Sequence, residues 1–571
     1  MNRRMIPFLT LISLLSISAF SSEWLSRSAS PDWSSEAKLG LGETRENIYG
    51  LDESQLEEVK KEGYIHALKW PVKVTGLKIP YEPLKYFLEE EKKNPLKRLI
   101  EKIAEKKLGY NDMDGLYEWL GLNKFPERDV PDVFQIPYPD HVKPDYRVGA
   151  SILDTKNGKA MTYSCATCHS GTFLGKTVMG LTNKRPRANE FFVMAKKYVP
   201  LIPSGFFRVA TNATHAEKAM FKRTKNNLKY VDAVAPQVLG LDTSLPHVSL
   251  SLAKRQDDEY ATKKPRRTSR RQRRKQPKLK TFVADSKPMP WWNLKYKTRW
   301  LSDGSIVSGN PILTNFLWNE LGRGTDLKEL ESWMRDNSNK IKEITAAAFA
   351  TKAPGWSDFF PADSINLESA KRGEVVYNNS CKKCHGTYEK AWSLPNSEEL
   401  TLAEKLTTTK VIYHEQTPVK DVGTDPNRWM ATKEFSGALN KLAISKWMKT
   451  KVVPQKGYVP PPLEGVFLRY PYFHNNSIPN LCALMERPDR RPKVFVQGPS
   501  TKAEHFDEDC VGYPVGDKIP KEWWKEKDAI YRANKPGLLN IGHSKAFYDE
   551  SGKSKMSQGQ KKDLRSYLKT L

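Results

Sequence analysis

The amino-acid sequence predicts a mainly helical protein with long loops, built from an N-terminal extension and two domains of similar design. Three observations support this prediction. One five-residue motif occurs twice, near residues 165 and 381; small and apolar residues at helical spacing precede the second copy; and the chain ends in an amphipathic helical pattern. With 571 residues, of which 39% are hydrophobic, the chain exceeds what one hydrophobic core normally serves.

Residues 1–21 have the pattern of a secretory signal peptide. Arg3 and Arg4 precede an apolar run from Met5 to Phe20, and Ala19-Phe20-Ser21 places small residues at the usual cleavage spacing. The run is shorter than a membrane span, and no later segment approaches about eighteen consecutive apolar residues. We therefore expect a periplasmic or secreted mature chain with no transmembrane span; an uncleaved N-terminal anchor is the alternative.

The formal net charge of +27 suits an acidic partner, an anionic surface or a solvated exterior. No nucleic-acid-binding module is legible, and nucleic acid is not expected as the partner of an exported chain. The densest basic run, Lys263–Lys275, has nine Lys or Arg among thirteen residues and lies in a predicted surface loop, 255–285. It is either a docking arm for an acidic redox partner or an insertion without a role.

Four of the six cysteines form the two copies of the motif, Cys165-Ala166-Thr167-Cys168-His169 and Cys381-Lys382-Lys383-Cys384-His385. On a helical turn, positions i, i+3 and i+4 share one face, so both thiols can join the vinyl groups of one porphyrin, with the histidine beneath the iron. C-x-x-C-H is the attachment motif of c-type haem. The sequence therefore predicts two covalently bound haem c groups with His169 and His385 as axial ligands.

Other chemistries of paired cysteines fit this pattern less well. A thioredoxin-like pair requires a βαβ context, which is not evident, and zinc-binding pairs normally lie tens of residues apart. The remaining Cys482 and Cys510 predict a disulfide in an oxidising compartment, with two free buried thiols as the alternative.

The motifs divide the mature chain into three parts. Residues 22–145 contain no cysteine and form an N-terminal extension, with a charged helical stretch around 81–107, that packs on the first haem domain. The first haem domain spans 146–355 and the second spans 356–571. Both are expected to be class I cytochrome c-type domains with long loops.

The second domain has the clearest helical patterns. Ala370, Gly373 and Val376-Tyr377 have the spacing of a first cytochrome c helix, in which a glycine lets another helix pack closely. Ser557 and Gln560 form a capping-box pattern. The stripe that follows, Leu564, Tyr567, Leu568 and Leu571, predicts a terminal helix that packs on the first one.

Several further segments carry a family resemblance. They are Val422-Gly423-Thr424-Asp425-Pro426, the block from Pro471 to Leu481 (with Asn476 where a glycine is usual), Asn540-Ile541-Gly542-His543, and His66-Ala67-Leu68 with Trp70-Pro71-Val72. They resemble the di-haem cytochrome c peroxidase superfamily, and most closely its branch containing the di-haem rubber oxygenase.

The resemblance implies roles for several residues of the second site. His543 is expected to be the distal ligand of the second haem, with Met430 and Met448 as alternatives, since His/Met ligation is common in electron-transfer domains. His474 is expected to support a haem propionate or to be a structural histidine.

At the first site, the resemblance implies a distal face that is open to dioxygen or peroxide. Trp291 and Trp292 are candidates to carry electrons between the haems or to line this pocket, or they are simply core residues. Phe316 is a further candidate for the distal wall.

The sequence thus predicts a periplasmic di-haem oxidoreductase that activates O₂ or H₂O₂ at the haem of His169, with the second haem as electron relay and a small redox protein as partner. A peroxidase would need a distal acid–base group, whereas an oxygenase would use a dry aromatic pocket. A hydrogen-peroxide-reducing cytochrome c peroxidase, a non-enzymatic electron carrier with two six-coordinate haems, and a redox-sensing or docking module are the alternatives.

Overall fold

The computed structural model describes residues 23–28, 30–89, 112–255, 260 and 283–571. The fold is 45% helical and 11% strand, which confirms the mainly helical class. The predicted signal peptide and most of the basic loop lie outside the described residues. Of the helices in the described ranges, none combines the length and apolarity required to cross a bilayer.

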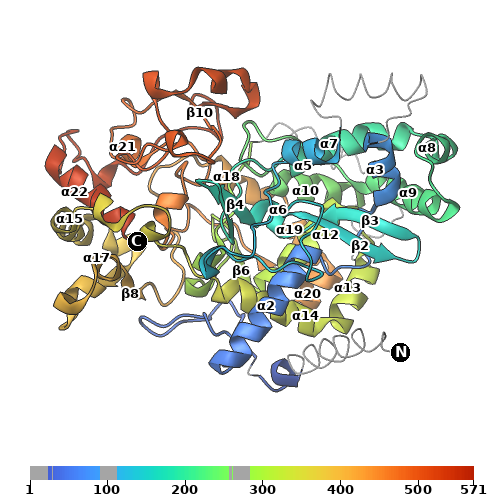
Figure 1. Cartoon of the computed structure of the whole chain (residues 1–571), viewed down its shortest axis with the longest axis horizontal. Coiled ribbons are helices and arrows are strands. Elements are labelled where there is room, and N and C mark those ends of the chain that lie inside the picture. Colours follow the sequence, from blue (N-terminus) through green and yellow to red (C-terminus); the bar gives the residue numbers. More distant parts are fainter. Residues whose placement is uncertain (1–22, 29, 90–111, 256–259, 261–282) are drawn as a thin grey trace, which may run out of the picture.

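The helices are distributed along the whole described chain (Figure 1). Those that precede the second motif are α2 (Glu53–Lys69), α3 (Tyr81–Glu89), α5 (Met113–Trp119), α6 (Ala166–His169), α7 (Ala188–Tyr198), α8 (Ser204–Ala210), α9 (His215–Asn227), α10 (Ser244–Arg255), α12 (Pro311–Gly322), α13 (Leu327–Asp336), α14 (Ser338–Ala350) and α15 (Leu367–Ser380). The second motif forms α16 (Lys382–His385). The helices that follow it are α17 (Leu402–Lys405), α18 (Asn427–Ala431), α19 (Ser436–Lys441), α20 (Ala443–Trp447), α21 (Leu481–Leu484) and α22 (Gln558–Lys569).

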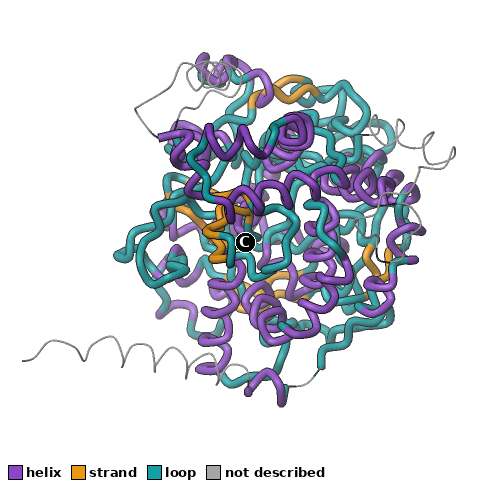
Figure 2. Tube along the Cα trace, turned by 90° about the vertical axis from the view of Figure 1, so that its right-hand side faces the viewer, coloured by secondary structure: helices purple, strands orange, loops and turns teal. Residues whose placement is uncertain are grey.

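The strands form small antiparallel sheets, and long loops connect the elements (Figure 2). The largest described sheet has the order β1-β3-β2. The strands are β1 (Ile79–Pro80), β2 (Ala150–Thr155), β3 (Gly158–Tyr163), β4 (Ser170–Phe173), β5 (Lys176–Met179), β6 (Ile306–Ser308), β7 (Thr387–Lys390), β8 (Thr408–Ile412), β9 (Lys451–Val452), β10 (Val494–Val496) and β11 (Ile530–Arg532).

The terminal helix α22 crosses α15, as the sequence predicts. Gly373 lies at the crossing, where a Cβ atom would be 2.0 Å from the carbonyl oxygen of Asp563. The Asp563 carboxylate accepts a hydrogen bond from Ser369 Oγ at 2.6 Å and pairs with Arg372 at 2.9 Å. Because only glycine has no Cβ, Gly373 allows the two helix backbones to approach this closely.

A second helix crossing has the same design. At Gly63 of α2, a Cβ atom would lie 2.1 Å from the carbonyl oxygen of Glu343 in α14. His66 Nε2 also pairs with the Glu343 carboxylate, at 2.9 Å. The segment 22–145 therefore supplies one helix of this pair, although α2 lies far from α14 along the chain.

Each C-x-x-C-H motif lies between a crossing helix and a β-hairpin. In the second region, Cys381 N–H donates to the carbonyl oxygen of Tyr377 in α15 at 2.8 Å, and β7 and β8 follow the motif. In the first region, Cys165 N–H donates to the carbonyl oxygen of Ala67 in α2 at 3.1 Å, and β4 and β5 follow. The two regions thus share the same arrangement of crossing helix, motif and hairpin. In the second region the helix comes directly before the motif in the sequence, whereas in the first region α2 lies far upstream of it.

Two large hydrophobic cores surround these regions. The C-terminal core contains Tyr377, Phe467 and Tyr567, and the N-terminal core contains Ala166 and Phe349, among others. The segment that holds α19 and α20 contributes to the N-terminal core, although it follows the second motif in sequence. The cores meet at adjacent tryptophans, because Trp291 belongs to the N-terminal core and Trp292 to the C-terminal core.

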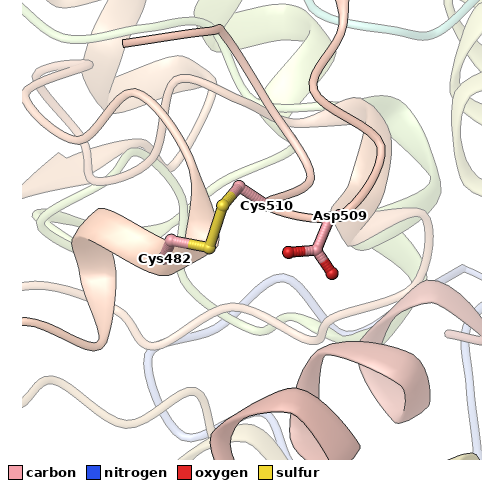
Figure 3. A group of neighbouring side chains, drawn as sticks. All are labelled: Cys482, Asp509 and Cys510. Atoms are coloured by element: carbon pink, nitrogen blue, oxygen red, sulfur yellow. A yellow bond between two sulfur atoms is a disulfide. The ribbon is translucent and has the colours of Figure 1, made fainter. Parts of the chain in front are cut away.

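Cys482 and Cys510 form a disulfide, which confirms their predicted pairing (Figure 3). The bond joins α21 to a loop near α22. Asp509 lies beside it and forms an ion pair with Arg565 of α22 at 3.2 Å. Because both sulfur atoms are used in the disulfide, this group has no thiolate to offer a metal ion.

Candidate haem sites

His385 of the second motif is oriented by a backbone carbonyl. Its Nδ1 donates to the carbonyl oxygen of Pro461 at 2.8 Å, which leaves the lone pair of Nε2 available to a metal. Burial lowers the pKa of His385 to about 4, so the imidazole is in the neutral form that binds metals at pH 7. Tyr388 Oη donates to the carbonyl oxygen of His385 at 2.9 Å and fixes the backbone.

His543 lies opposite His385. The two ring centroids are 6.2 Å apart. Two imidazoles on opposite sides of one metal ion, each bound at about 2 Å, have centroids about 6 Å apart. Burial, followed by the nearby His385, lowers the pKa of His543 to about 3, so it too is neutral. The donor pair therefore fits a haem iron held between two imidazoles.

The methionines considered as alternative ligands lie elsewhere. Met430 has a 43% exposed side chain, and Met448 is buried in the N-terminal core. The side chain that the structure places against the His385 ring is the His543 imidazole.

Loops that carry the family resemblance hold the His543 segment in place. His543 N–H donates to the carbonyl oxygen of Val422 at 2.8 Å, and the Asp425 carboxylate accepts from the N–H groups of Gly537 and Leu539. A Cβ atom on Gly542 would lie 2.3 Å from the backbone of Gly423, so this glycine permits the loop contact.

The 471–481 block supports the same segment from another side. Asn475 Nδ2 donates to the carbonyl oxygens of Gly537 and Leu539 at 3.1 and 3.2 Å. Asn476, which stands where a glycine is usual, has a φ of 59°, a left-handed conformation that asparagine tolerates. The turn therefore forms without the glycine.

Arg491 was not identified from the sequence, yet it anchors the loop before His543. Its Nη1 donates to the carbonyl oxygens of Asn540 and Gly542 at 2.6 and 2.9 Å, and its guanidinium lies over the ring of Phe473. The relative exposure of Arg491 is only 2%, and a charged side chain buried to this degree is uncommon. The burial of this arginine could not be predicted from the sequence, because no local pattern distinguishes a buried arginine from an exposed one.

The first motif has a different environment. His169 Nδ1 is buried and makes no hydrogen bond, although the backbone of Met289 is near enough to oppose the shift in its pKa. Burial lowers the pKa of His169 to about 4, so its imidazole is also neutral. Its ring contact is with Trp291, at a centroid distance of 5.6 Å. Within the described ranges, no second imidazole pairs with His169.

The motif thiols do not resemble a reactive redox pair. Burial raises the pKa of Cys165 and of Cys381 to about 12, and it also raises the pKa of Cys168. Reactive C-x-x-C pairs have a lowered thiol pKa instead. Both pairs are unbridged, whereas Cys482 and Cys510 are joined.

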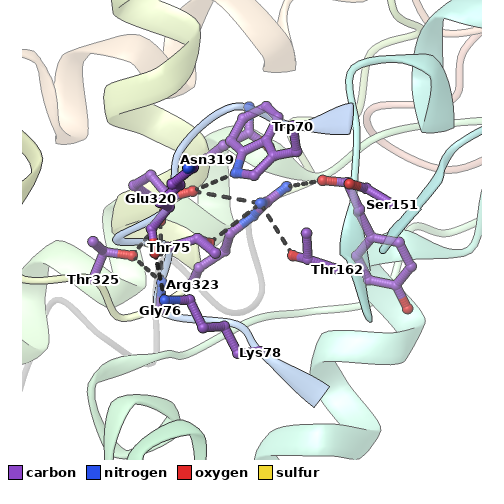
Figure 4. A network of polar contacts seen from close by, with 12 residues as sticks. Trp70, Thr75, Gly76, Lys78, Ser151, Thr162, Asn319, Glu320, Arg323 and Thr325 are labelled. Carbon is purple, nitrogen blue, oxygen red and sulfur yellow. Dashed lines mark hydrogen bonds and ion pairs between the residues drawn. The ribbon is translucent and has the colours of Figure 1, made fainter. Parts of the chain in front are cut away.

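A buried polar network lies behind the first motif (Figure 4). Arg323 stacks on the Trp70 ring at 4.0 Å, and its Nη2 donates to the carbonyl oxygen of Tyr163 at 3.0 Å. Glu320 accepts from Trp70 Nε1 at 3.0 Å and lies 3.4 Å from Arg323. The network fixes the strand that leads to Cys165, and neither Glu320 nor Arg323 was identified from the sequence.

Trp291 contacts the first motif, and Trp292 contacts the segment that holds His385 of the second. Trp291 contacts His169 and also stacks on Tyr64 at 6.2 Å. Trp292 Nε1 donates to the carbonyl oxygen of Glu464 at 2.9 Å, three residues after Pro461, which holds His385. The tryptophan pair therefore lies between the two motif histidines.

Two other candidates have mainly aromatic surroundings. His474 stacks on Tyr458 with centroids 3.8 Å apart, and its carbonyl oxygen accepts from Lys287 N–H at 2.7 Å. Phe316 is fully buried against Trp70 and Trp333 in the N-terminal core. Their predicted roles at a propionate and at the distal wall stay predictions.

Comparison with known proteins gives one family match. Residues 457–496 match a family model described as RoxA-like, cytochrome c-like. The match includes Pro461, the 471–481 block and Arg491. It supports the rubber-oxygenase-like branch and a haem-containing oxidoreductase with a c-type haem, and it gives no support to the wider di-haem peroxidase superfamily.

Two curated relatives are uncharacterized proteins of Sinorhizobium fredii (strain NBRC 101917 / NGR234). Protein y4iJ is 28% identical over 270 residues, covering 38% of this chain and 41% of y4iJ. Protein y4iM is 26% identical over 252 residues, covering 37% of this chain and 50% of y4iM. The chain thus spans half or less of the length of these relatives.

Proposed function

We propose that the protein is an exported di-haem c-type cytochrome oxidoreductase. The His169 site reacts with O₂ or peroxide, and the His385–His543 site relays electrons. The observation that carries this proposal is the asymmetry of the two sites: His385 faces a second imidazole at a centroid distance of 6.2 Å, whereas the ring contact of His169 is with an indole.

The presence of two haems is supported by the shared spatial order of the two motif regions. Each has a glycine-mediated helix crossing, a short helix with the C-x-x-C-H residues, and a hairpin. A bound haem supplies one-electron redox chemistry and a site for O₂ or peroxide. The cysteines of each motif would attach it, His169 and His385 would each bind the iron of one haem, and His543 would supply a second imidazole at the His385 site.

Trp291 and Trp292 are proposed to carry electrons between the sites. Trp291 contacts His169, and the hydrogen bond from Trp292 to Glu464 leads along the backbone to Pro461 and His385. Their burial in two adjoining cores keeps both rings in fixed positions.

Peroxide reduction is the alternative reaction at the same site, since an architecture can be shared without a shared substrate. The match to the rubber-oxygenase-like branch favours an oxygenase acting on an apolar substrate. The electron partner is proposed to be a small acidic redox protein, because the chain is strongly basic.

The ferric absorption spectrum of the purified protein, with and without cyanide, tests the proposal. We expect two haems per chain, one low-spin and unchanged by cyanide and one that binds it. Two haems whose spectra are both unchanged by cyanide would indicate a non-enzymatic carrier. A single haem per chain would contradict the di-haem assignment. Oxygen uptake on an unsaturated hydrocarbon, compared with peroxide turnover by a reduced small cytochrome, separates the two reactions.

A further inference from the structure

Four basic side chains lie between the two motifs, two of them buried and two partly exposed. They are Lys184, Lys287, Lys297 and Arg469, and we call them the central cationic cluster. Burial lowers the pKa of each, to about 7 for Lys297 and about 10 for Arg469. Arg469 further lowers the pKa of Lys287 and Lys297, and Lys287 further lowers that of Lys184. The four groups are therefore coupled in a chain, from Lys184 through Lys287 and Arg469 to Lys297.

The cluster reaches both sites. The Lys297 ammonium donates to Met289 Sδ at 2.7 Å, and the Met289 backbone lies beside His169. Arg469 Nη1 donates to the carbonyl oxygen of Pro462 at 2.5 Å, one residue after Pro461, which holds His385. Lys287 joins these positions, because its ammonium donates to the carbonyl oxygens of Arg469 and Pro471.

Two of the four cluster side chains, Lys184 and Lys297, have no oxygen partner in the described structure. Lys184 Nζ is buried over the Tyr470 ring at 3.3 Å and has no hydrogen-bond partner in the described structure. The contact of Lys297 Nζ is a thioether sulfur, a weak acceptor. By contrast, the equally buried Lys390 donates to Leu406 O, Thr408 Oγ1 and Thr570 O. Lys390 shows how this protein satisfies a buried ammonium that needs no ligand.

Nearby carboxylates do not neutralise the cluster. Glu464, the carboxylate that acts on Arg469, also faces Lys295 at 3.9 Å, and Glu46 lies on the other side of that lysine at 3.1 Å. Arg428, another buried cation, has its own partner in Asp303 at 3.3 Å. Burying several uncompensated charges is costly, so the cluster is suited to anionic oxygens supplied by a ligand.

We propose that the central cationic cluster binds the propionate carboxylates of both haems and couples the two sites electrostatically. Two haems carry four propionates, which matches four cations. This inference rests on the proposed function, because it requires a haem at each motif. Lys297 lies on the His169 side, Arg469 lies on the His385 side, and Lys287 connects them.

The test is the midpoint potential of each haem, measured by spectroelectrochemistry on the full-length holoprotein. In Lys297→Met and Arg469→Met, propionates that lose their counter-cation stabilise the oxidised iron, so both potentials should fall. The expected change is about tenfold in each one-electron reduction equilibrium, which is about 59 mV. Lys184→Met breaks no hydrogen bond of the described structure, and it provides the same test if another variant fails to fold.

Two controls accompany these variants. Arg469→Lys keeps the charge and should retain most of the wild-type potential, whereas Lys390→Met should lower stability without moving either potential. Unchanged potentials in variants that retain two haems would overturn the proposal, and so would a shift confined to one haem. A wild-type protein with fewer than two haems would instead overturn the proposed function.

Discussion

The imidazole of His543 is placed by the loop around it. Its backbone has a φ of 58°, a left-handed conformation that is unfavourable for a histidine. The hydrogen bond from its N–H to Val422 and the two bonds from Arg491 to the preceding carbonyl groups hold this conformation. Such strain at one residue is consistent with a position whose side chain must point at a ligand.

His543→Ala should open the second haem. Removing the sixth ligand should convert this haem to a high-spin form that binds cyanide, while both haems stay attached through their cysteines. Ferric spectra with and without cyanide measure the change. The double variant Met430→Leu, Met448→Leu is the control and should keep the wild-type spectrum. A high-spin second haem in this double variant would instead show that a methionine is the sixth ligand.

A second histidine determines part of the acid sensitivity of the protein. His247 is buried, its Nε2 bonds to the carbonyl oxygen of Gly322 at 3.0 Å, and burial lowers its pKa to about 4. The unfolded chain binds this proton below about pH 6.5 and the folded chain does not until about pH 4. Stability is therefore full above pH 6.5 and is lost as the pH falls toward 4.

His247→Gln should flatten this pH dependence, because glutamine can donate the same hydrogen bond without titrating. We expect the free energy of unfolding of the wild type to lose roughly 3 kcal/mol more than the variant between pH 7 and pH 4. Urea unfolding at both pH values measures the difference. Equal losses in the two proteins would mean that His247 is not held neutral.

At the scale of elements, the two glycine-mediated crossings determine how closely the helices pack. The contact opposite Gly373 is a backbone carbonyl, which cannot rotate away as a side chain could. The same is true of Gly63 opposite Glu343. An added methyl group must therefore separate the helices of either pair.

Gly373→Ala should destabilise the protein by about 1–3 kcal/mol through overpacking. Gly437 in α19 is the matched control, since an added Cβ atom there would meet open space and alanine favours helix. We expect Gly437→Ala to be neutral or slightly stabilising in urea unfolding. Similar losses in both variants would contradict a specific role for the α15–α22 crossing.

The disulfide between Cys482 and Cys510 stabilises the segment that leads from the 471–481 block to α22. It closes a loop with a sequence separation of 28, for which the chain-entropy estimate is about 3–4 kcal/mol. Replacing both cysteines with serine should lower the free energy of unfolding by about this amount. Reduced wild-type protein should match the variant, and an unchanged midpoint after reduction would contradict the prediction.

At the scale of the whole molecule, the two cores meet at the Trp291–Trp292 pair. Trp291 contacts His169, and Trp292 donates to Glu464, in the segment whose Pro461 carbonyl accepts from His385. A pair of tryptophans in a core needs no function to be buried, but this pair has one member in each core.

Trp292→Phe should slow electron exchange between the haems while leaving both absorption spectra intact. Trp392→Phe is the matched control, because its Nε1 also makes one hydrogen bond, to Glu374 at 3.0 Å, in the same core. Each variant should lose about 1 kcal/mol of stability with that bond. Flash photolysis of the half-reduced protein with CO bound at the open haem measures the exchange, and equal rates in both variants would exclude a special role for Trp292.

The local features of this protein follow from the sequence alone. The C-x-x-C-H spacing, the stripe of α22 and the glycine of α15 are patterns within a few residues, and periodicity reveals them because each depends on the geometry of a single helix. The pairing of Cys482 with Cys510 was also inferred, since no other cysteines were left outside the motifs.

Only the tertiary structure decided which distant segments meet. The family resemblance implied His543 as the partner of His385, but the tertiary structure alone placed α2 beside the first motif, Arg491 behind the His543 loop and four basic side chains between the motifs. These contacts join residues far apart in the chain, and they depend on how both cores pack rather than on any local preference. The sequence does not show whether a lysine or arginine is buried or exposed. The role of its charge can therefore be inferred only when the surrounding residues are known.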